Sequence, residues 1–138
     1  MAQVRGIGGV FFKSDNPQAL NAWYEKHLGI VSRPNEGAMF HWRRADDSSK
    51  GEITVWSVFP SSTKYFEPSK ASFMLNYIVD DLDATLAELR GAGVTVDDRV
   101  EEYDYGKFGW ISDPDGNRIE LWEPRGSFET PNSDDQAH

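Results

Sequence analysis

The stretch Asp113-Pro114-Asp115-Gly116-Asn117-Arg118-Ile119-Glu120-Leu121 runs from a tight turn into a strand near the end of the chain. Pro114 presets its φ, the aspartates can accept hydrogen bonds from backbone N–H groups, and Gly116 can adopt a positive φ. The stretch therefore predicts a hairpin turn followed by a last strand over residues 118–123. Side chains alternate along a strand, so Glu120 should point to the face opposite its two apolar neighbours.

The elements before this turn follow one plan twice. Asn16 is a suitable N-cap, Pro17 is tolerated at a first helical position, and Gly29 is suited to end the helix. Asp80 and Asp81 precede a second helix in the same way. We expect strands at 8–12, 38–43, 52–59, 73–79, 94–100, 108–112 and 118–123, helices at 17–28 and from 82 to about 91, and a linker at 60–70.

Equivalent residues of the two halves are separated by a nearly constant distance in the sequence. Asn16 and Asp81 are 65 residues apart, Gly29 and Gly93 are 64 apart, and 53–57 and 119–123 are 66 apart. This spacing predicts two βαβββ modules, at about 6–60 and 71–125, within one domain over residues 1–125. Residues 126–138 are polar and acidic and are expected to form a flexible tail.

The composition excludes several classes of function. The 138 residues include no cysteine, which excludes thiolate catalysis and thiolate metal sites and favours the cytoplasm. The net charge is 14 − 23 = −9, which opposes binding to nucleic acid. No apolar run approaches the ~20 residues of a membrane span, so no membrane partner is expected.

The motifs of both halves resemble the vicinal oxygen chelate superfamily. They are Asn16-Pro17, Trp23-Tyr24 and His27-Leu28-Gly29 in the first half, and Val79-Asp80-Asp81-Leu82-Asp83 and the run 113–121 in the second. This group includes glyoxalase I, extradiol dioxygenases and bleomycin-resistance proteins. The resemblance covers about residues 6–125. It implies an α+β fold in which two tandem βαβββ modules form a curled mixed sheet around a cavity, and it implies a homodimer.

The resemblance also implies where a metal would bind. In metal-using members, the first and last strands of each module supply one ligand each, which falls here on Gly9, Thr54, Met74 and Glu120. Only Glu120 binds a hard divalent ion strongly, whereas a catalytic site normally keeps three protein ligands. We therefore expect no metal cofactor, with Glu120 the only ligand if one is bound. A shift of one residue would bring Glu52 or Asn76 into these positions, and a metal held by Glu120, Glu52 and His41 is a further alternative.

Glu120 is the candidate catalytic residue. A lone carboxylate in an aromatic pocket has a raised pKa and can act as a general base. The alternative is a structural carboxylate held by Arg118 or another cation. Asn76 should face inward with Glu120, where its amide would either orient a ligand or bond a neighbouring strand.

Aromatic side chains are the candidate walls of the cavity. Trp56 and Trp122 lie two residues beyond Thr54 and Glu120 and are predicted to point toward the cavity openings. The predicted ligand contacts are Asn76, Trp56, Trp122, Thr54, Met74, Trp110, Phe108 and Tyr105. The acidic run over 97–104 is either a solvated face or an attraction for a cationic ligand.

Two functions remain open from the sequence. The first is a glyoxalase-like, metal-independent lyase or isomerase that acts on a small organic molecule, with Glu120 as its base. The second is a non-catalytic binding protein of the bleomycin-resistance type, whose aromatic walls hold a planar or cationic drug or metabolite. A metal-dependent glyoxalase or dioxygenase with altered ligands is the third reading.

Overall fold

The computed structural model describes residues 3–34 and 36–126, in which seven strands form one sheet with two helices. The elements in chain order are β1 (Val4–Ser14), α1 (Pro17–Leu28), β2 (Ala38–Arg43), β3 (Gly51–Pro60), β4 (Phe73–Val79), α2 (Leu82–Gly91), β5 (Thr95–Tyr103), β6 (Gly106–Ser112) and β7 (Arg118–Pro124). Of the predicted tail, all but Gly126 lies outside the described residues.

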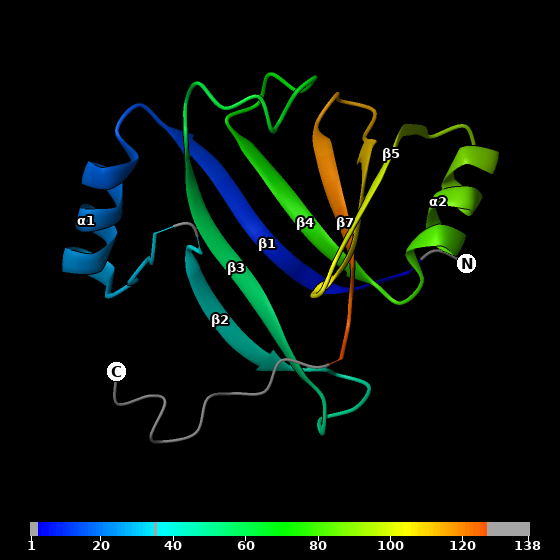
Figure 1. Cartoon of the computed structure of the whole chain (residues 1–138), viewed down its shortest axis with the longest axis horizontal. Helices are drawn as coiled ribbons and strands as arrows, with labels where there is room; N and C mark the ends of the chain where they lie inside the picture. The colour runs from blue at the N-terminus through cyan, green and yellow to red at the C-terminus, as the bar shows by residue number, and fades with distance from the viewer. Residues whose placement is uncertain (1–2, 35, 127–138) are drawn as a thin grey trace.

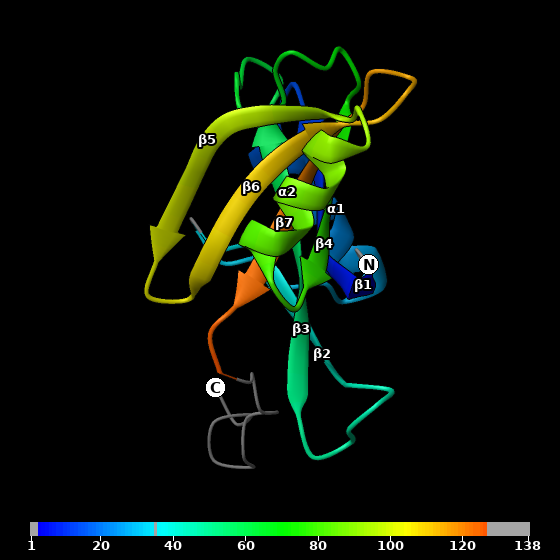
Figure 2. The ribbon, with the colours of Figure 1, turned by 90° about the vertical axis from the view of Figure 1, so that its right-hand side faces the viewer.

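The sheet is mixed and curled, as predicted. Its strand order is β2-β3-β1-β4-β7-β6-β5, with β1 and β4 antiparallel at the centre. The pairs β1–β3 and β4–β7 are parallel. Figure 2 shows β5 and β6 curving away from the central strands, so the sheet has a concave side. The α+β fold class with a curled sheet is confirmed.

Both helices begin and end at the predicted residues. The side chain of Asn16 accepts a hydrogen bond from Ala19 N at 3.1 Å, and that of Asp81 accepts one from Ala84 N at 3.0 Å. Gly29 ends α1 with a φ of 68°, a left-handed conformation that glycine adopts without strain. These caps are local, which is why the sequence predicts them.

The helices cover the outer side of the sheet at its two ends (Figure 1). Under α1, Trp56 of β3 packs against Tyr24, with ring centroids 4.8 Å apart. Under α2, Leu121 of β7 packs with Leu82 and Leu86. Trp56 and Leu121 therefore occupy equivalent places in the two halves.

The first half is shorter than the predicted module. The second half has the complete βαβββ order, but the first has β1, α1, β2 and β3. Where the second half has β5, the described residues of 30–37 form an isolated bridge between Arg33 and Gly37. Pro34 in this short segment lacks the N–H that a strand ladder uses, which accounts for the missing strand.

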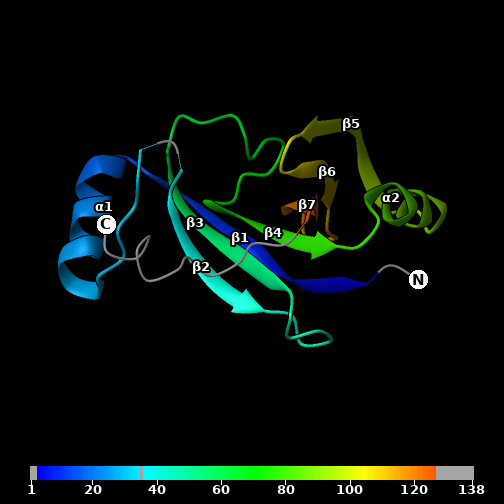
Figure 3. The ribbon, with the colours of Figure 1, turned by 60° about the horizontal axis from the view of Figure 1, so that its bottom comes forward.

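The predicted linker is part of the core. Phe66, in the connection between β3 and β4, is completely buried against Phe11, Met74 and Trp110 on the concave side. Figure 3 shows this connection on the same side of the sheet as β5 and β6. The concave side is therefore filled around its centre by aromatic side chains.

Within the described part of the chain, neither helix is long and apolar enough to cross a membrane.

Candidate functional site

Glu120 is the centre of a buried polar cluster on the concave side. Glu120 is only 2% exposed to solvent. Asn76 Nδ2 donates a hydrogen bond to Oε1 at 2.6 Å, and Trp110 Nε1 donates one to Oε2 at 3.1 Å. The hydroxyl of Tyr65 also donates to Oε2. Both carboxylate oxygens therefore have donors, all of them neutral.

The sheet register explains three of these four positions. Glu120 of β7 is paired with Asn76 of β4 on one side and with Trp110 of β6 on the other. Paired residues of adjacent strands point to the same face, so three neighbouring strands deliver the three side chains to one place. Tyr65 reaches Glu120 from the β3–β4 connection, where its ring is stacked on Phe59 at 5.7 Å.

Burial controls the protonation of this cluster. Burial raises the pKa of Glu120, and the hydrogen bonds from Tyr65, Asn76 and Trp110 lower it by less. Burial also raises the pKa of Tyr65, and the neighbouring Glu120 carboxylate adds to this effect. Tyr65 therefore stays a hydroxyl donor, and Glu120 keeps its proton to a higher pH than an exposed glutamate does.

A glycine makes room for Asn76. A β-carbon on Gly8 of β1 would lie 2.3 Å from Asn76 Oδ1 and 2.9 Å from both Ile78 and Trp122. Such contacts are too short for any residue but glycine. Asn76 Oδ1 is buried and has no hydrogen-bond partner within residues 3–34 and 36–126, so its amide is oriented by the bond to Glu120.

An open hollow lies on the other side of Tyr65. It has a volume of about 410 Å³ and is lined by Lys64, Tyr65, Glu67, Pro68, Asp97, Arg99 and Arg118. Tyr65 both lines this hollow and bonds Glu120. A small molecule in the hollow would be separated from the Glu120 carboxyl by the Tyr65 side chain.

The residues at the implied metal positions do not fit a divalent ion. Gly9 has no side chain, and Met74 is buried against Phe11 and Trp110. The three donors around Glu120 point their hydrogens at the oxygens that a cation would need. Among the described residues, no three His, Cys, Asp or Glu side chains are close enough to hold a metal.

Thr54 and Trp56 lie away from Glu120, contrary to their predicted placement. Trp56 packs under α1 on the outer side, and alternation places Thr54 on the same side of β3. The Thr54 hydroxyl donates to Ile7 O at 2.6 Å and accepts from Trp42 Nε1 at 2.9 Å. The equivalence of Trp56 with Leu121 makes Val55, an apolar residue, the counterpart of Glu120.

The other predicted contact residues divide into two groups. Met74 lies beside Trp110 in the core next to Glu120. Phe108 packs against this cluster and also stacks on Trp122 at 5.7 Å in a neighbouring cluster, and Trp122 donates to Tyr105 O at 3.0 Å. The Tyr105 ring is more than half exposed at the turn between β5 and β6. These three are not brought to the Glu120 carboxyl.

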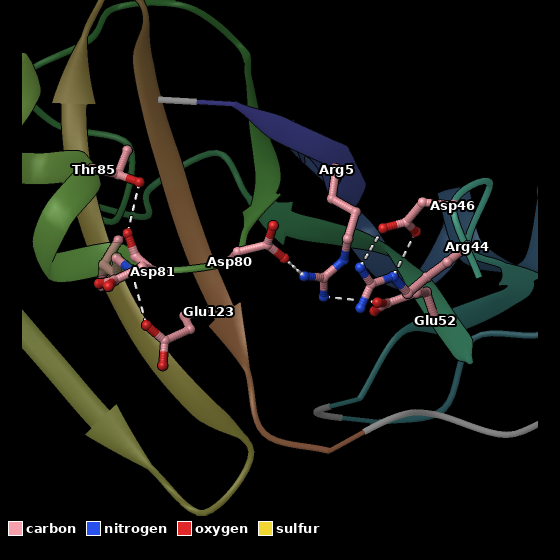
Figure 4. Close-up of polar contacts among 9 residues, drawn as sticks. Arg5, Arg44, Asp46, Glu52, Asp80, Asp81, Thr85 and Glu123 are labelled. Atoms are coloured by element: carbon pink, nitrogen blue, oxygen red, sulfur yellow. Dashed lines mark hydrogen bonds and ion pairs between the residues drawn. The ribbon is translucent and has the colours of Figure 1, made fainter. Parts of the chain in front are cut away.

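Glu52 and His41, the alternative metal ligands, are also elsewhere. Glu52 is buried and pairs with Arg5 at 2.7 Å, and Arg5 also pairs with Asp80 (Figure 4). His41 is exposed on β2, paired with Ile53 of β3. The structure thus separates Glu120, Glu52 and His41.

Sequence reasoning missed Tyr65 as a partner of Glu120. It lies in a segment without periodicity, and its contact spans 55 residues of sequence. Arg118, which the alternative interpretation placed as a cation holding Glu120, instead pairs with Asp97 at 3.3 Å and lies over the Trp110 ring at 5.2 Å. A tyrosine within an irregular segment carries no sequence signal for such a contact.

Comparison with known families and proteins gives two matches by sequence. Residues 9–122 match a family described as the glyoxalase-like domain. The uncharacterized protein YaeR of Escherichia coli (strain K12) is 33% identical over 92 residues, which cover 59% of this chain and 71% of that protein.

Solved structures with the same fold include methylmalonyl-CoA epimerases and a glyoxalase. The Mycobacterium tuberculosis epimerase has a TM-score of 0.60 at 20% identity, covering 88% of this chain and 89% of its own. A Streptomyces coelicolor epimerase variant in complex with 2-nitronate-propionyl-CoA has a TM-score of 0.63 at 18% identity, covering 94% and 100%. A Mn(II)-bound glyoxalase from Novosphingobium aromaticivorans has a TM-score of 0.61 at 17% identity, covering 96% and 44%. At these identities the likeness concerns the fold.

Proposed function

The chain belongs to the glyoxalase-like domain family of the vicinal oxygen chelate superfamily, and from this premise we propose that it binds a small organic molecule and transfers a proton on it without a metal. Glu120 is the proposed base. The observation that carries the proposal is a buried carboxyl separated by one tyrosine side chain from an open hollow.

The protonation state of Glu120 supports this role. A general base works best when its pKa lies near the working pH, and burial raises the pKa of Glu120 from its ordinary value. Oε2 becomes available to a ligand when the Tyr65 hydroxyl turns away from it. Asn76 and Trp110 keep the carboxylate in place during this exchange.

The proposed chemistry is the removal of a proton from carbon next to a carbonyl group. The C–H electron pair moves into the carbonyl to give an enolate, and the proton goes to Glu120 Oε2. Tyr65, which lines the hollow, is the donor available to the enolate oxygen. Return of the proton to the other face or to a neighbouring carbon completes an isomerisation.

Hydrogen exchange in D₂O tests this function without knowledge of the substrate. A panel of small carbonyl compounds is incubated with the protein after treatment with a chelator, and loss of the proton next to the carbonyl is followed by NMR. The wild type should accelerate exchange of at least one compound, and Glu120→Gln should abolish it. Glu123→Gln is the matched control, because Glu123 lies on the same strand but bonds Leu82 N at α2.

A non-catalytic binding protein is the second candidate. The observation that favours it is the complete hydrogen bonding of Glu120, which suits a structural carboxylate. Binding of a panel compound without exchange in either wild type or Glu120→Gln would support this candidate and contradict proton transfer.

We also propose a homodimer. The edge strand β2 exposes Met39 and Phe40, each about half exposed, and an edge strand with apolar side chains favours association. Light scattering should give twice the 15.6 kDa chain mass, and Phe40→Lys should reduce it toward one chain.

A further inference from the structure

We propose that the hollow beside Tyr65 selects an organic carboxylate, whose charged end binds Arg118 and Arg99. This inference rests on the proposed function at the same site, because it names the class of molecule that would meet Glu120. It differs from the cationic ligand that the acidic composition suggested.

The side chains that line the hollow favour an anion. Three of them are cations, Lys64, Arg99 and Arg118, and two are carboxylates, Glu67 and Asp97. The whole chain has the opposite balance, with a net charge of −9. The lining of the hollow therefore has more positive than negative side chains, although the chain as a whole is negatively charged.

Arg118 has an unused donor at this place. Its side chain is 7% exposed, and its Nε is buried without a hydrogen-bond partner among the described residues. Asp97 accepts from Nη1 at the long distance of 3.3 Å. A guanidinium group presents a planar fork that matches a carboxylate with two parallel hydrogen bonds. Because Nε is shielded in this conformation, a ligand carboxylate would reach it after a rotation of the side chain and would then satisfy the donor that the described residues leave unpaired.

Both arginines lie against the ring of Trp110. The guanidinium carbons of Arg118 and Arg99 lie 5.2 Å and 5.3 Å from the centre of its ring. Trp110 is buried and also donates to Glu120. The same indole thus fixes the position of the anion-binding groups relative to the proposed base.

This arrangement determines how the ligand would lie. Its carboxylate would face Arg118 and Arg99, because a second carboxylate next to Glu120 would repel it. Its uncharged end would face Tyr65 and, once that side chain moves, Glu120. The volume of about 410 Å³ is sufficient for a small organic acid.

Three carboxylates of the acidic run over 97–104 are already paired with arginines. Asp97 accepts from Arg99 N at 2.9 Å and bonds Arg118. Glu101 pairs with Arg99 at 3.3 Å, and Glu102 pairs with Arg125. These carboxylates are therefore engaged by arginines of the chain, which weakens the case for a cationic ligand.

Three probes of one shape and different charge test the selectivity. Benzoate, benzamide and benzylammonium are titrated into the ¹⁵N-labelled protein, with the indole N–H signals and the backbone signals of 97–99 and 118 as readout. Benzoate should shift these signals and should bind at least about tenfold more tightly than benzamide, with benzylammonium weakest, since tenfold is about 1.4 kcal/mol. Inorganic phosphate in competition distinguishes a general oxyanion site, which it would block, from a carboxylate site, which it would leave open.

Two variants locate the binding. Arg118→Gln should weaken benzoate binding about tenfold or more, and Arg99→Gln, at a largely exposed side chain, should weaken it severalfold. Arg125→Gln is the matched control, because Arg125 pairs with Glu102 away from the hollow. It should leave the affinity unchanged.

The outcomes separate this inference from the proposed function. Four results would overturn the carboxylate selectivity. They are equal affinity for benzoate and benzamide, no binding of benzoate, unchanged benzoate affinity in both Arg118→Gln and Arg99→Gln, and competition by phosphate at equal strength. None of these results bears on hydrogen exchange by Glu120, which the D₂O experiment measures with uncharged carbonyl compounds as well. Conversely, absence of exchange with selective benzoate binding would overturn the catalysis and leave the carboxylate site standing.

Discussion

The amide of Asn76 and the carboxylate of Glu120 face each other across the parallel pair of β4 and β7, joined by a hydrogen bond of 2.6 Å. Both strands of this pair thus contribute to a buried polar cluster beside the apolar core of the concave side. Buried polar groups must be hydrogen-bonded to be tolerated, so each member of this cluster affects the stability of the others.

Tyr65→Phe removes the hydroxyl that donates to Glu120 without changing the ring. Because a hydrogen bond to a charged group contributes about 1.5–3 kcal/mol, the free energy of unfolding should fall by that order. Urea denaturation measures the change. Tyr105→Phe, at an exposed ring, is the control, and its free energy of unfolding should stay within about 0.5 kcal/mol of the wild-type value. An equal loss of unfolding free energy in the two variants would show that the hydrogen bond from Tyr65 to Glu120 does not form in solution.

Gly8→Ala tests the close approach of β1 to Asn76. The new β-carbon would meet Asn76 Oδ1 at 2.3 Å, so the amide must move and its bond to Glu120 must break. We expect a loss of about 2 kcal/mol or more in the free energy of unfolding. Gly91→Ala at the end of α2 has open space and should be neutral or stabilising by up to about 1 kcal/mol. A Gly8→Ala protein as stable as wild type would contradict this packing.

The pH dependence of stability reports the pKa of Glu120. Burial raises this pKa above the ordinary value of 4.5, so in the window above pH 4.5 the folded chain keeps a proton that the unfolded chain has lost. The contribution of Glu120 to stability is therefore complete below pH 4.5 and is lost as the pH rises through the raised pKa. The difference in unfolding free energy between wild type and Glu120→Gln should fall across this window. A difference that rises with pH would mean that the hydrogen bonds outweigh burial.

Divalent metals should not stabilise the protein. A resident site stabilises by about 2.7 kcal/mol when the free metal is at a hundred times its dissociation constant. Because the positions next to Glu120 lack further ligands, thermal unfolding in excess Mn²⁺, Ni²⁺ or Zn²⁺ should show no such shift in wild type beyond that in Glu120→Gln. A rise in the unfolding temperature with metal that is absent in Glu120→Gln would instead support a metal-dependent enzyme.

Glu52→Ala should destabilise the fold outside the proposed site. Glu52 and Arg5 form a largely buried pair, and the loss of one partner leaves the other charge without compensation, at a cost of about 3–5 kcal/mol. Asp46→Ala breaks the exposed pair with Arg44 and should leave the denaturation midpoint unchanged. Hydrogen exchange by the folded Glu52→Ala protein should match wild type, because Glu52 lies far from the hollow. Equal denaturation midpoints for Glu52→Ala and Asp46→Ala would show that the Arg5–Glu52 pair is solvent-exposed rather than buried.

The elements that the sequence predicted depend on local rules. The caps at Asn16 and Asp81 each use a side chain within three residues of its partner, and the turn over 113–117 is held by hydrogen bonds within itself. The alternation that put Asn76 and Glu120 on one face is also a property of each strand alone. Family motifs built from these residues were enough to predict the curled sheet.

The tertiary structure decided which residues of β3 correspond to Glu120 and Trp122 of β7. A repeat offset of 66 residues made Thr54 and Trp56 partners of Glu120 and Trp122, but the packing of Trp56 under α1 corresponds to that of Leu121 under α2. A difference of one residue moves every side chain of a strand to the other face, and sequence spacing with loops of unequal length does not fix it.

The chain sequence by itself determined that a single carboxylate would sit on the inner face of the last strand, because strand alternation is local. Only the folded chain determined that Tyr65, 55 residues away, bonds this carboxylate, and that Arg118 and Arg99 both lie over the Trp110 ring. The physical reason is that such contacts arise from the curvature of the sheet and the path of an irregular connection, which depend on the packing of the whole core.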